Sequence, residues 1–192
     1  MDRRGRTRAG VEVELRIETP RLVLRRPREV DAEAILARYA ADPDVTHYLG
    51  WPRHRSLDDT RAFLRFSDVE WDRAPAGPYL IFSREDDRLL GSTGLAFRSP
   101  TDAEVGYVLA RDAWGLGYAS EALTAMMALA RRLGVTELSA RCHVDHRPSR
   151  RVLEKAGFTR EDEHGVPMLF PNLDAARPQA ALVYRYAFSK EE

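Results

Sequence analysis

The stretch that decides the fold is Arg111-Asp112-Ala113-Trp114-Gly115-Leu116-Gly117-Tyr118-Ala119. It follows a strand predicted over residues 103–110 and leads into the clearest helical pattern of the chain, over residues 117–133. A glycine-rich turn at the start of a helix leaves backbone N–H groups free at the positive end of the helix dipole. Such a turn binds phosphate, and the missing side chains of Gly115 and Gly117 let a pyrophosphate approach the backbone.

Taken alone, the Gly-x-Gly pair is equally compatible with a tight strand-to-helix turn that binds nothing. Residues 113–116 contain no strong side-chain cap for the helix, which favours a ligand. The first amides of this helix therefore need water or a ligand as their hydrogen-bond acceptor. The sequence predicts a phosphate loop here, with the plain turn as the alternative.

Hydrophobic periodicity divides the rest of the chain into helices and strands. We expect helices over residues 30–41, 58–71, 117–133 and 149–156, and strands over 21–26, 78–83, 89–97, 103–110, 137–144 and 182–188, with a short strand from Phe158. Residues 166–179 hold three prolines, so this segment is expected to be a long loop. The order predicts one α/β domain with a mixed sheet.

The composition is that of an ordinary soluble domain, with 192 residues, 44% hydrophobic and 31% charged. Residues 15–192 are expected to form this domain, and the polar residues 1–14 a flexible tail. Thirty basic residues balance thirty acidic ones, which gives no support for nucleic-acid or membrane binding. The chain shows no membrane-length apolar run and no leader-like segment, so a cytoplasmic location is expected.

Cysteine and histidine usage argues against disulfide and metal chemistry. Cys142 is the only cysteine, and no Cys/His cluster has the spacing of metal ligands, so no metal site is expected. We interpret Cys142 as a small core residue, because an unshifted thiol is mostly protonated at neutral pH.

Two further segments strengthen the prediction of a phosphate loop. Residues 103–109 read Ala-Glu-Val-Gly-Tyr-Val-Leu, and residues 149–158 read Ser-Arg-Arg-Val-Leu-Glu-Lys-Ala-Gly-Phe. Together with residues 114–122, they resemble the acetyl-CoA motifs of the GNAT superfamily, and within it the ribosomal-protein alanine N-acetyltransferases (the RimJ/RimL-like branch). Residues 18–25 also match the usual start of such domains. The resemblance covers about residues 17–188.

The resemblance implies an α/β GNAT fold. Its sheet is mixed and mostly antiparallel, with about seven strands, about four flanking helices, and a splay between the fourth and fifth strands. It also implies acetyl-CoA as donor, with the pantetheine arm in the splay beside Val108, Leu109 and Ala110. The thioester is expected near Ser149. The pyrophosphate is expected on the amides of Trp114, Gly115, Leu116, Gly117, Tyr118, Ala119 and Ser120.

The implied reaction is direct attack of a neutral amine on the thioester carbonyl. Glu104 is the best candidate to accept the amine proton through a water, and Ser149 to protonate the leaving thiolate. A backbone N–H at Leu109 or Ala110 could stabilise negative charge on the carbonyl oxygen. Plainer interpretations stay open, with Glu104 as a structural carboxylate and Ser149 as the N-cap of the short helix.

The sequence departs from the family pattern near the thioester. Many members have a tyrosine acid where this chain has Leu153, which shifts the donor role to Ser149. His146 stands where the family usually has asparagine; it is expected either to bind the pantetheine amides or to face solvent. His143 could line the site or be packed in the core.

The acceptor side of the site is expected around Trp51, Arg53 and His54, in the loop between the first two helices. The alternative is a loop anchored by one buried tryptophan. A site without a strong base suits an α-amine, which is roughly 15% neutral at pH 7, against about 0.04% for lysine.

We therefore expect an N-acetyltransferase, a monomer or homodimer, that acts on the α-amine of a peptide, a protein N-terminus or a small molecule. The alternatives are a non-catalytic acyl-CoA-binding module and an acetyltransferase for a small amine or antibiotic.

Overall fold

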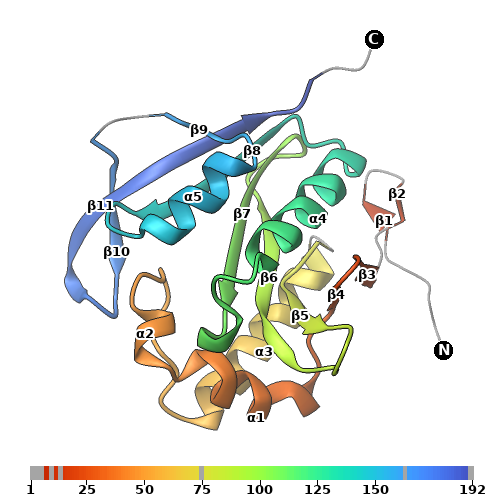
Figure 1. The fold of residues 1–192 in the computed structure, drawn as a ribbon, viewed down its shortest axis with the longest axis vertical. Coiled ribbons are helices and arrows are strands. Elements are labelled where there is room, and N and C mark those ends of the chain that lie inside the picture. Colours follow the sequence, from red (N-terminus) through yellow and green to blue (C-terminus); the bar gives the residue numbers. More distant parts are fainter. Residues whose placement is uncertain (1–6, 9–10, 13–14, 74–75, 162–163, 190–192) are drawn as a thin grey trace.

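The computed structural model describes residues 7–8, 11–12, 15–73, 76–161 and 164–189. Most of them belong to one nine-stranded sheet and its flanking helices (Figure 1). A separate antiparallel pair is formed by β1 (Thr7–Arg8) and β2 (Val11–Glu12). The strands of the large sheet are β3 (Arg16–Glu18), β4 (Leu22–Arg25), β5 (Tyr79–Ser83), β6 (Leu89–Phe97), β7 (Asp102–Leu109), β8 (Glu137–His143), β9 (Thr159–Arg160), β10 (Val166–Phe170) and β11 (Asp174–Ala187).

The strands lie in the order β10-β11-β8-β7-β6-β5-β4-β3, and β9 pairs with β11. Only β7 and β8, among the described pairs, run parallel. Their pairing covers residues 102–104 and 137–139, although the strands continue to Leu109 and His143. The two strands therefore separate toward their carboxyl ends. This is the splay expected between the fourth and fifth predicted strands, and the mixed, mostly antiparallel sheet confirms the predicted fold.

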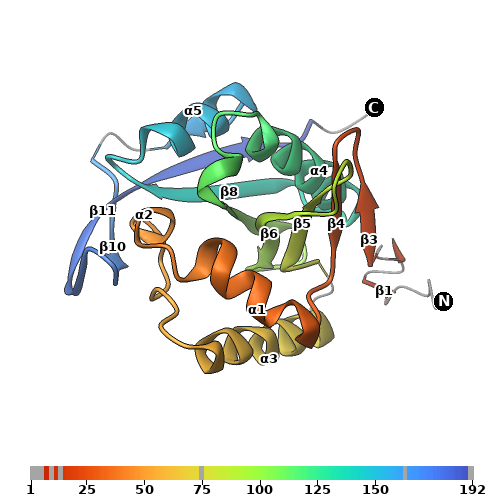
Figure 2. The ribbon, with the colours of Figure 1, turned by 60° about the horizontal axis from the view of Figure 1, so that its bottom comes forward.

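Helices cover both faces of the sheet. Figure 2 shows α1 and α3 on one side and α4 and α5 on the other. Apolar side chains of α4 such as Leu123 and Met126 belong to one core, and Ile35 and Leu64 belong to a second. All five residues of β5 are buried, as expected for a strand covered on both faces. The α-helices described are α1 (Ala32–Ile35), α2 (Pro43–Thr46), α3 (Leu57–Arg73), α4 (Tyr118–Arg132) and α5 (Arg147–Lys155).

The first predicted helix, over residues 30–41, is composite in the structure. A 3₁₀ turn (Glu29–Asp31), α1 and a π-helical turn (Leu36–Ala40) follow one another without a break. The prediction lacks α2, which begins where the sequence indicates only a helix break. Asp42 caps it through the backbone amides of the first turn, and Pro43 occupies its first position, where proline is tolerated.

The predicted long loop over residues 166–179 is wrong. β10 and β11 form an antiparallel hairpin there, with Val166 opposite Ala181. Pro167 is compatible with this strand because β10 lies at the edge of the sheet, where a missing N–H leaves no ladder incomplete. The short strand β3 and the hairpin strand β10, which were not predicted, raise the described sheet to nine strands rather than about seven. The described helices number five rather than about four.

The predicted flexible tail, residues 1–14, lies mostly outside the described residues, and β1 and β2 are its described part.

Of the helices that the structure describes, none has the length and apolar character needed to cross a membrane.

Candidate functional site

A glycine turn between β7 and α4 occupies the place of the predicted phosphate loop. A short 3₁₀ turn (Arg111–Ala113) leads into it. Gly115 and Gly117 have φ angles of 74° and 81°, in the left-handed region that favours glycine. Gly117 is the N-cap of α4, and no described side chain caps this helix end. The amides of residues 118–120 therefore lie at a helix start without a side-chain acceptor.

Trp114 and Leu116 stand on the surface of this turn, with 47% and 52% of their area exposed. The indole N–H of Trp114 donates a hydrogen bond of 2.9 Å to the carbonyl oxygen of Leu109. This bond folds the loop back onto the end of β7. A hydrogen bond within the chain therefore helps to fix the conformation of this loop.

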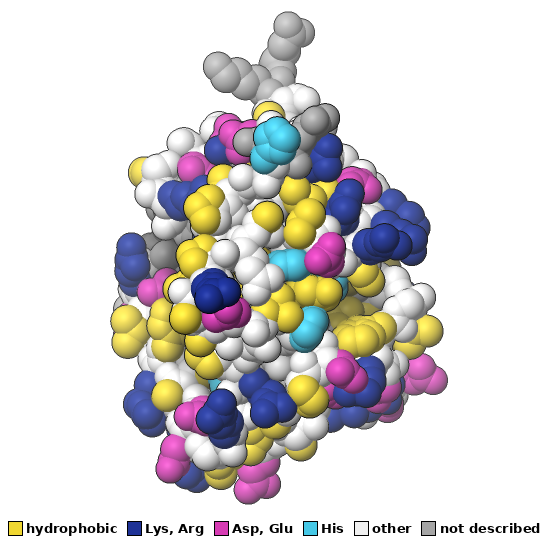
Figure 3. Space-filling model, turned by 90° about the vertical axis from the view of Figure 1, so that its left-hand side faces the viewer, with side chains coloured by type: hydrophobic (Ala, Val, Ile, Leu, Met, Phe, Trp, Pro, Cys, Tyr) yellow, Lys and Arg dark blue, Asp and Glu magenta, His cyan; other side chains and the backbone are white. Residues whose placement is uncertain are grey.

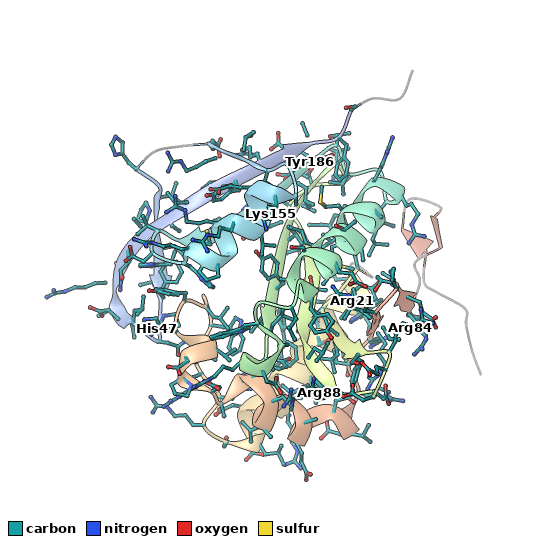
Figure 4. The ribbon with its side chains drawn as sticks, viewed as in Figure 1. Arg21, His47, Arg84, Arg88, Lys155 and Tyr186 are labelled. Carbon is teal, nitrogen blue, oxygen red and sulfur yellow. The ribbon has the colours of Figure 1, made fainter. Side chains whose placement is uncertain are left out.

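An ion pair fastens the loop to the start of the sheet. Arg21 (labelled in Figure 4) donates from Nε to Glu121 Oε2 at 2.7 Å and from Nη1 to the carbonyl oxygen of Leu116 at 2.9 Å. Glu121 Oε1 also accepts from Thr19 Oγ1 at 2.6 Å. Burial raises the pKa of Glu121, but the hydrogen bonds from Thr19 and Arg21 outweigh burial and leave this pKa below its usual value. Glu121 is therefore ionised at neutral pH.

A cavity of about 1130 Å³ lies in the splay. Its walls are β6, β7, the end of β10 with the turn after it, α3, the loop over residues 47–55 and the first turns of α5. Figure 3 shows hydrophobic and histidine side chains gathered near the middle of the face that carries α2 and β10. The cavity joins the separated strands to the predicted acceptor loop, so donor and acceptor sides share one space.

Ser149 lines this cavity from the first turn of α5. The N-cap of α5 is His146, so the interpretation of Ser149 as the cap is wrong. Ser149 Oγ lies 3.0 Å from Tyr107 Oη, and Tyr107 Oη also donates to the carbonyl oxygen of Ser149 at 3.2 Å. Because a carbonyl only accepts, the phenolic proton serves that bond, and Tyr107 Oη can accept from the Ser149 hydroxyl.

Tyr107 is a site residue that the sequence analysis missed. Burial raises the pKa of its phenol, so the group stays protonated at neutral pH. It lines the cavity from β7, within the splay. Its only signal in the sequence is its place in the motif before the glycine turn, which does not indicate its contact with Ser149.

Glu104 also lines the cavity, with 20% of its side chain exposed. Arg141 donates to both of its oxygens, from Nε to Oε1 at 3.0 Å and from Nη2 to Oε2 at 2.9 Å. Arg98 forms a second ion pair with Oε2. The carboxylate borders the cavity, and its oxygens are engaged by two guanidinium groups.

The backbone at the end of β7 offers fewer free groups than expected. Val108 lines the cavity, whereas Leu109 and Ala110 are buried. The N–H of Ala110 donates to the carbonyl oxygen of Leu90 at 2.7 Å, so it is not free to stabilise a substrate oxygen. Of the two backbone donors considered from the sequence, the N–H of Leu109 is the one that remains.

Trp51 and His54 both line the cavity on its acceptor side. Their ring centroids lie 5.3 Å apart, and His54 lies 6.3 Å from the ring of Phe63. Nδ1 of His54 shares a hydrogen bond of 2.9 Å with Thr60 Oγ1. Burial lowers the pKa of His54, so its ring is neutral at pH 7. This wall is therefore aromatic and, at His54, uncharged.

Asn172, in the turn of the β10–β11 hairpin, connects that hairpin to the acceptor loop. Its Oδ1 accepts from the N–H of Arg53 at 2.7 Å. Its Nδ2 donates to the carbonyl oxygens of Thr46 and Trp51 at 2.7 and 2.9 Å. One side chain thus satisfies three backbone groups of the loop, a role that its sequence context does not indicate.

His143 is buried behind the cavity wall. Its ring stacks on that of Tyr48, with the ring centroids 4.8 Å apart. Of these two residues, only Tyr48 lines the cavity that the described residues form. The N–H of Asp145 donates to Nδ1 at 3.1 Å, so Nε2 carries the proton and donates to Gln179 Oε1 at 3.0 Å. These contacts correspond to the packed alternative for His143.

His146 is half-buried. Its ring lies 5.0 Å from that of Tyr48, and its buried Nδ1 has no hydrogen-bond partner among the described residues. Burial, together with the charges of His143 and His47, lowers the pKa of His146 to about 4. A neutral imidazole with an unused nitrogen therefore lies at the start of α5.

Cys142 lies in the core beneath the site. It is buried, and burial raises the pKa of its thiol to about 11. Within the described ranges, the structure brings together no group of three or more His, Cys, Asp or Glu side chains that could hold a metal ion.

Comparison with known proteins adds a family to this geometry. A family model described as an acetyltransferase (GNAT) domain matches residues 21–159. The curated protein p20 of Bacillus licheniformis, named an uncharacterized N-acetyltransferase, is 27% identical over 177 residues, 91% of this chain and 96% of its own length.

Solved structures of acetyltransferases share the fold. One is the Salmonella typhimurium acetyl transferase that modifies the N-terminal serine of the 50S ribosomal subunit protein L7/L12, with a TM-score of 0.72 and 22% identity over 89% of this chain and 97% of that one. Another is the microcin C7 self-immunity acetyltransferase MccE in complex with acetyl-CoA and AMP, with a TM-score of 0.78 and 17% identity over 88% and 94%. At these identities the likeness is one of fold.

Proposed function

This chain belongs to the GNAT acetyltransferase family and is an N-acetyltransferase with acetyl-CoA as donor, and we propose that its acceptor is an α-amine, on a peptide N-terminus or a small molecule. The engagement of Glu104 by Arg98 and Arg141 carries this proposal. A carboxylate committed to two cations suits an acceptor that arrives partly neutral. At pH 7 an α-amine is roughly 15% neutral, several hundred times the fraction of a lysine.

The residues of the glycine turn fit the pyrophosphate of acetyl-CoA. A Cβ at Gly115 would meet no described atom within 4 Å, so the backbone there is open to a ligand. The free amides of the first turn of α4 and the positive end of its helix dipole lie beside this open backbone. When bound, acetyl-CoA supplies an activated carbonyl whose leaving group is a thiolate.

Each residue of the site then has a proposed task. Glu104 accepts the amine proton through a water, and the Ser149 hydroxyl turns from Tyr107 Oη to donate its proton to the leaving sulfur and regains a proton from water. Tyr107 holds that hydroxyl in place from the opposite side of the splay. The N–H of Leu109 stabilises charge on the carbonyl oxygen. His146 lies outside the cavity lining, and its ring would turn to bring the unused Nδ1 to the pantetheine amides.

The acceptor is held on the opposite side of the cavity. Trp51 and His54 form its aromatic wall. His143 supports that wall indirectly, because it stacks on Tyr48. The cavity, of about 1130 Å³, is large enough for a chain end as well as a small molecule.

Thiol release with two matched peptides tests the proposal. One has a free N-terminus and no lysine, and the other has an acetylated N-terminus and one lysine. We expect turnover with the first peptide only. Release that is equally fast with the lysine peptide would contradict an α-amine acceptor.

The same assay tests the role of Glu104. Glu104→Gln should lower kcat/KM about a hundredfold, because a neutral amide cannot accept the proton. The exposed Glu85 lies outside the cavity lining, and Glu85→Gln is the matched control that should retain activity. Thermal melts of both variants separate a loss of catalysis from a loss of folding.

A further inference from the structure

Three carboxylates line the cavity, and each already has a partner. Asp59 accepts from two backbone amides just before α3, at 2.8 and 3.0 Å. Glu70 lies 3.6 Å from Arg73, and Glu104 is engaged by two arginines. Two of these three negative charges are therefore balanced by arginines, and the charge of Asp59 is held by backbone amides.

On balance, the unpaired charge on the wall is positive, with Arg53 and Arg55 against Asp59. Arg53, Arg55 and Arg141 line the cavity, and Arg141 is committed to Glu104. The guanidinium groups of Arg53 and Arg55 are exposed and have no anionic partner within the described part of the chain. His54, between them, is neutral at pH 7 because burial lowers its pKa. Two residues with unpaired guanidinium groups therefore line the cavity on its predicted acceptor side.

The backbone that carries these two arginines is held in place. The N–H of Arg53 donates to Asn172 Oδ1 at 2.7 Å, and the N–H of Arg55 donates to Asp59 Oδ2 at 2.8 Å. Because this backbone is already fixed, a ligand that binds the two side chains causes a smaller loss of conformational entropy in the loop. The planar guanidinium group matches the geometry of carboxylate and phosphate oxygens.

We propose that the acceptor carries an anionic group, a carboxylate or a phosphate, which binds Arg53 and Arg55 while the α-amine lies toward Glu104. The inference rests on the proposed α-amine function and adds the charge of the acceptor to it. Such pairs at a rim act on binding and encounter rather than on the chemical step. The two arginines should therefore change the affinity for the acceptor and the dependence of that affinity on salt.

Equilibrium binding to the CoA-saturated enzyme, measured by calorimetry, tests the inference. Three amidated peptides share an N-terminal serine and carry two glutamates, two glutamines or two lysines at the next positions. At low salt the glutamate peptide should bind about fivefold more tightly than the glutamine peptide. The lysine peptide should bind more weakly still, and added salt should reduce both differences. Glutamine or lysine peptides that bind as tightly as the glutamate peptide would overturn the inference.

Variants assign the preference to the two arginines. The double variant Arg53→Gln, Arg55→Gln should remove the preference for glutamate. Arg65→Gln, at an exposed arginine of α3 outside the cavity lining, should keep it. A preference that survives the double variant would overturn the inference.

Two outcomes are kept apart by this design. If no peptide with a free N-terminus is acetylated, the proposed α-amine function fails, and the ratio of binding constants still decides the charge of the ligand. A preference for phosphoserine amide over serine amide would assign the anion to a small phosphorylated amine. A preference confined to the glutamate peptide would assign it to an acidic chain end.

Discussion

At the scale of single residues, the contact between Tyr107 and Ser149 links strand β7 to helix α5 across the splay. Their hydroxyl oxygens lie 3.0 Å apart, although the residues are separated by 42 positions in the chain. The phenolic proton is committed to the Ser149 carbonyl, so the serine hydroxyl has a fixed acceptor on one side. Tyr107 is therefore a positioning residue whose effect depends on Ser149.

That dependence predicts a non-additive pair of variants. Tyr107→Phe should lower kcat about tenfold and leave the KM for acetyl-CoA unchanged. In the Ser149→Ala background the same change should cost nothing further, because the group it orients is gone. Tyr186→Phe, at a tyrosine outside the cavity lining, is the control. Equal losses in both backgrounds would show that Tyr107 acts without Ser149.

The sequence indicates Ser149 and Glu104 because both stand at fixed places in a motif. It does not indicate Tyr107 as the partner of Ser149, because their contact depends on how far β7 and β8 separate. The partners of Glu104 are hidden for a similar reason. Arg141 reaches it across the parallel pairing of β7 and β8, which no local pattern encodes.

At the scale of elements, the start of α4 is the proposed donor site. Gly117→Asp places a carboxylate against the expected pyrophosphate, so the Kd for acetyl-CoA should rise by more than about tenfold. A Cβ at this position would lie 3.4 Å from Arg21 Nη2, whose guanidinium group contacts the loop. The new carboxylate would therefore lie next to the loop. Calorimetry with acetyl-CoA measures the change.

Gly134 provides a matched control for backbone strain. Its φ angle of 79° is close to the 81° of Gly117, and it lies just after the other end of α4, in open space. Gly134→Asp should lower the melting temperature as Gly117→Asp does and leave acetyl-CoA affinity unchanged. Equal acetyl-CoA affinities of the parent protein and both variants would contradict the assignment of this turn as the phosphate loop.

The β10–β11 hairpin is the element that holds the acceptor loop. Asn172→Ala leaves two carbonyl groups and one amide of that loop without their partner. We expect about a tenfold rise in the acceptor KM with little change in the KM for acetyl-CoA. Asn172→Asp, which keeps the acceptor oxygen for Arg53, should be intermediate. An unchanged acceptor KM in the alanine variant would show that the hairpin does not support this wall.

The elements differ in how well the sequence predicts them. α4 is predicted because its buried residues Ala122, Leu123 and Met126 recur at helical spacing. The hairpin is missed because prolines are read as loop signals, whereas an edge strand accepts them. α2 is missed because Asp42-Pro43 reads equally well as the end of one helix or the cap of the next.

At the scale of the whole molecule, the neutral His146 couples folding to pH. Its pKa is about 4 in the folded protein, below the ordinary histidine value near 6.5. Between these values the unfolded chain binds a proton that the folded chain does not. Stability should therefore fall as the pH is lowered through this window, by roughly 2 kcal/mol at pH 4.5 from this group.

His146→Asn should remove this part of the pH dependence, because asparagine does not titrate. Urea unfolding at pH 7 and at pH 4.5 measures the free energy of unfolding of both proteins. The loss on acidification should be smaller in the variant than in the parent. Equal losses would mean that His146 takes up its proton in the folded state without cost.

One measurement addresses the central claim that this cavity transfers acetyl groups to α-amines. A peptide with both a free N-terminus and a lysine is incubated with the enzyme and acetyl-CoA, and fragmentation mass spectrometry locates the acetyl group. The account predicts acetylation of the N-terminal amine and an unmodified lysine. An acetyl group on the lysine, with the N-terminus free, would contradict it.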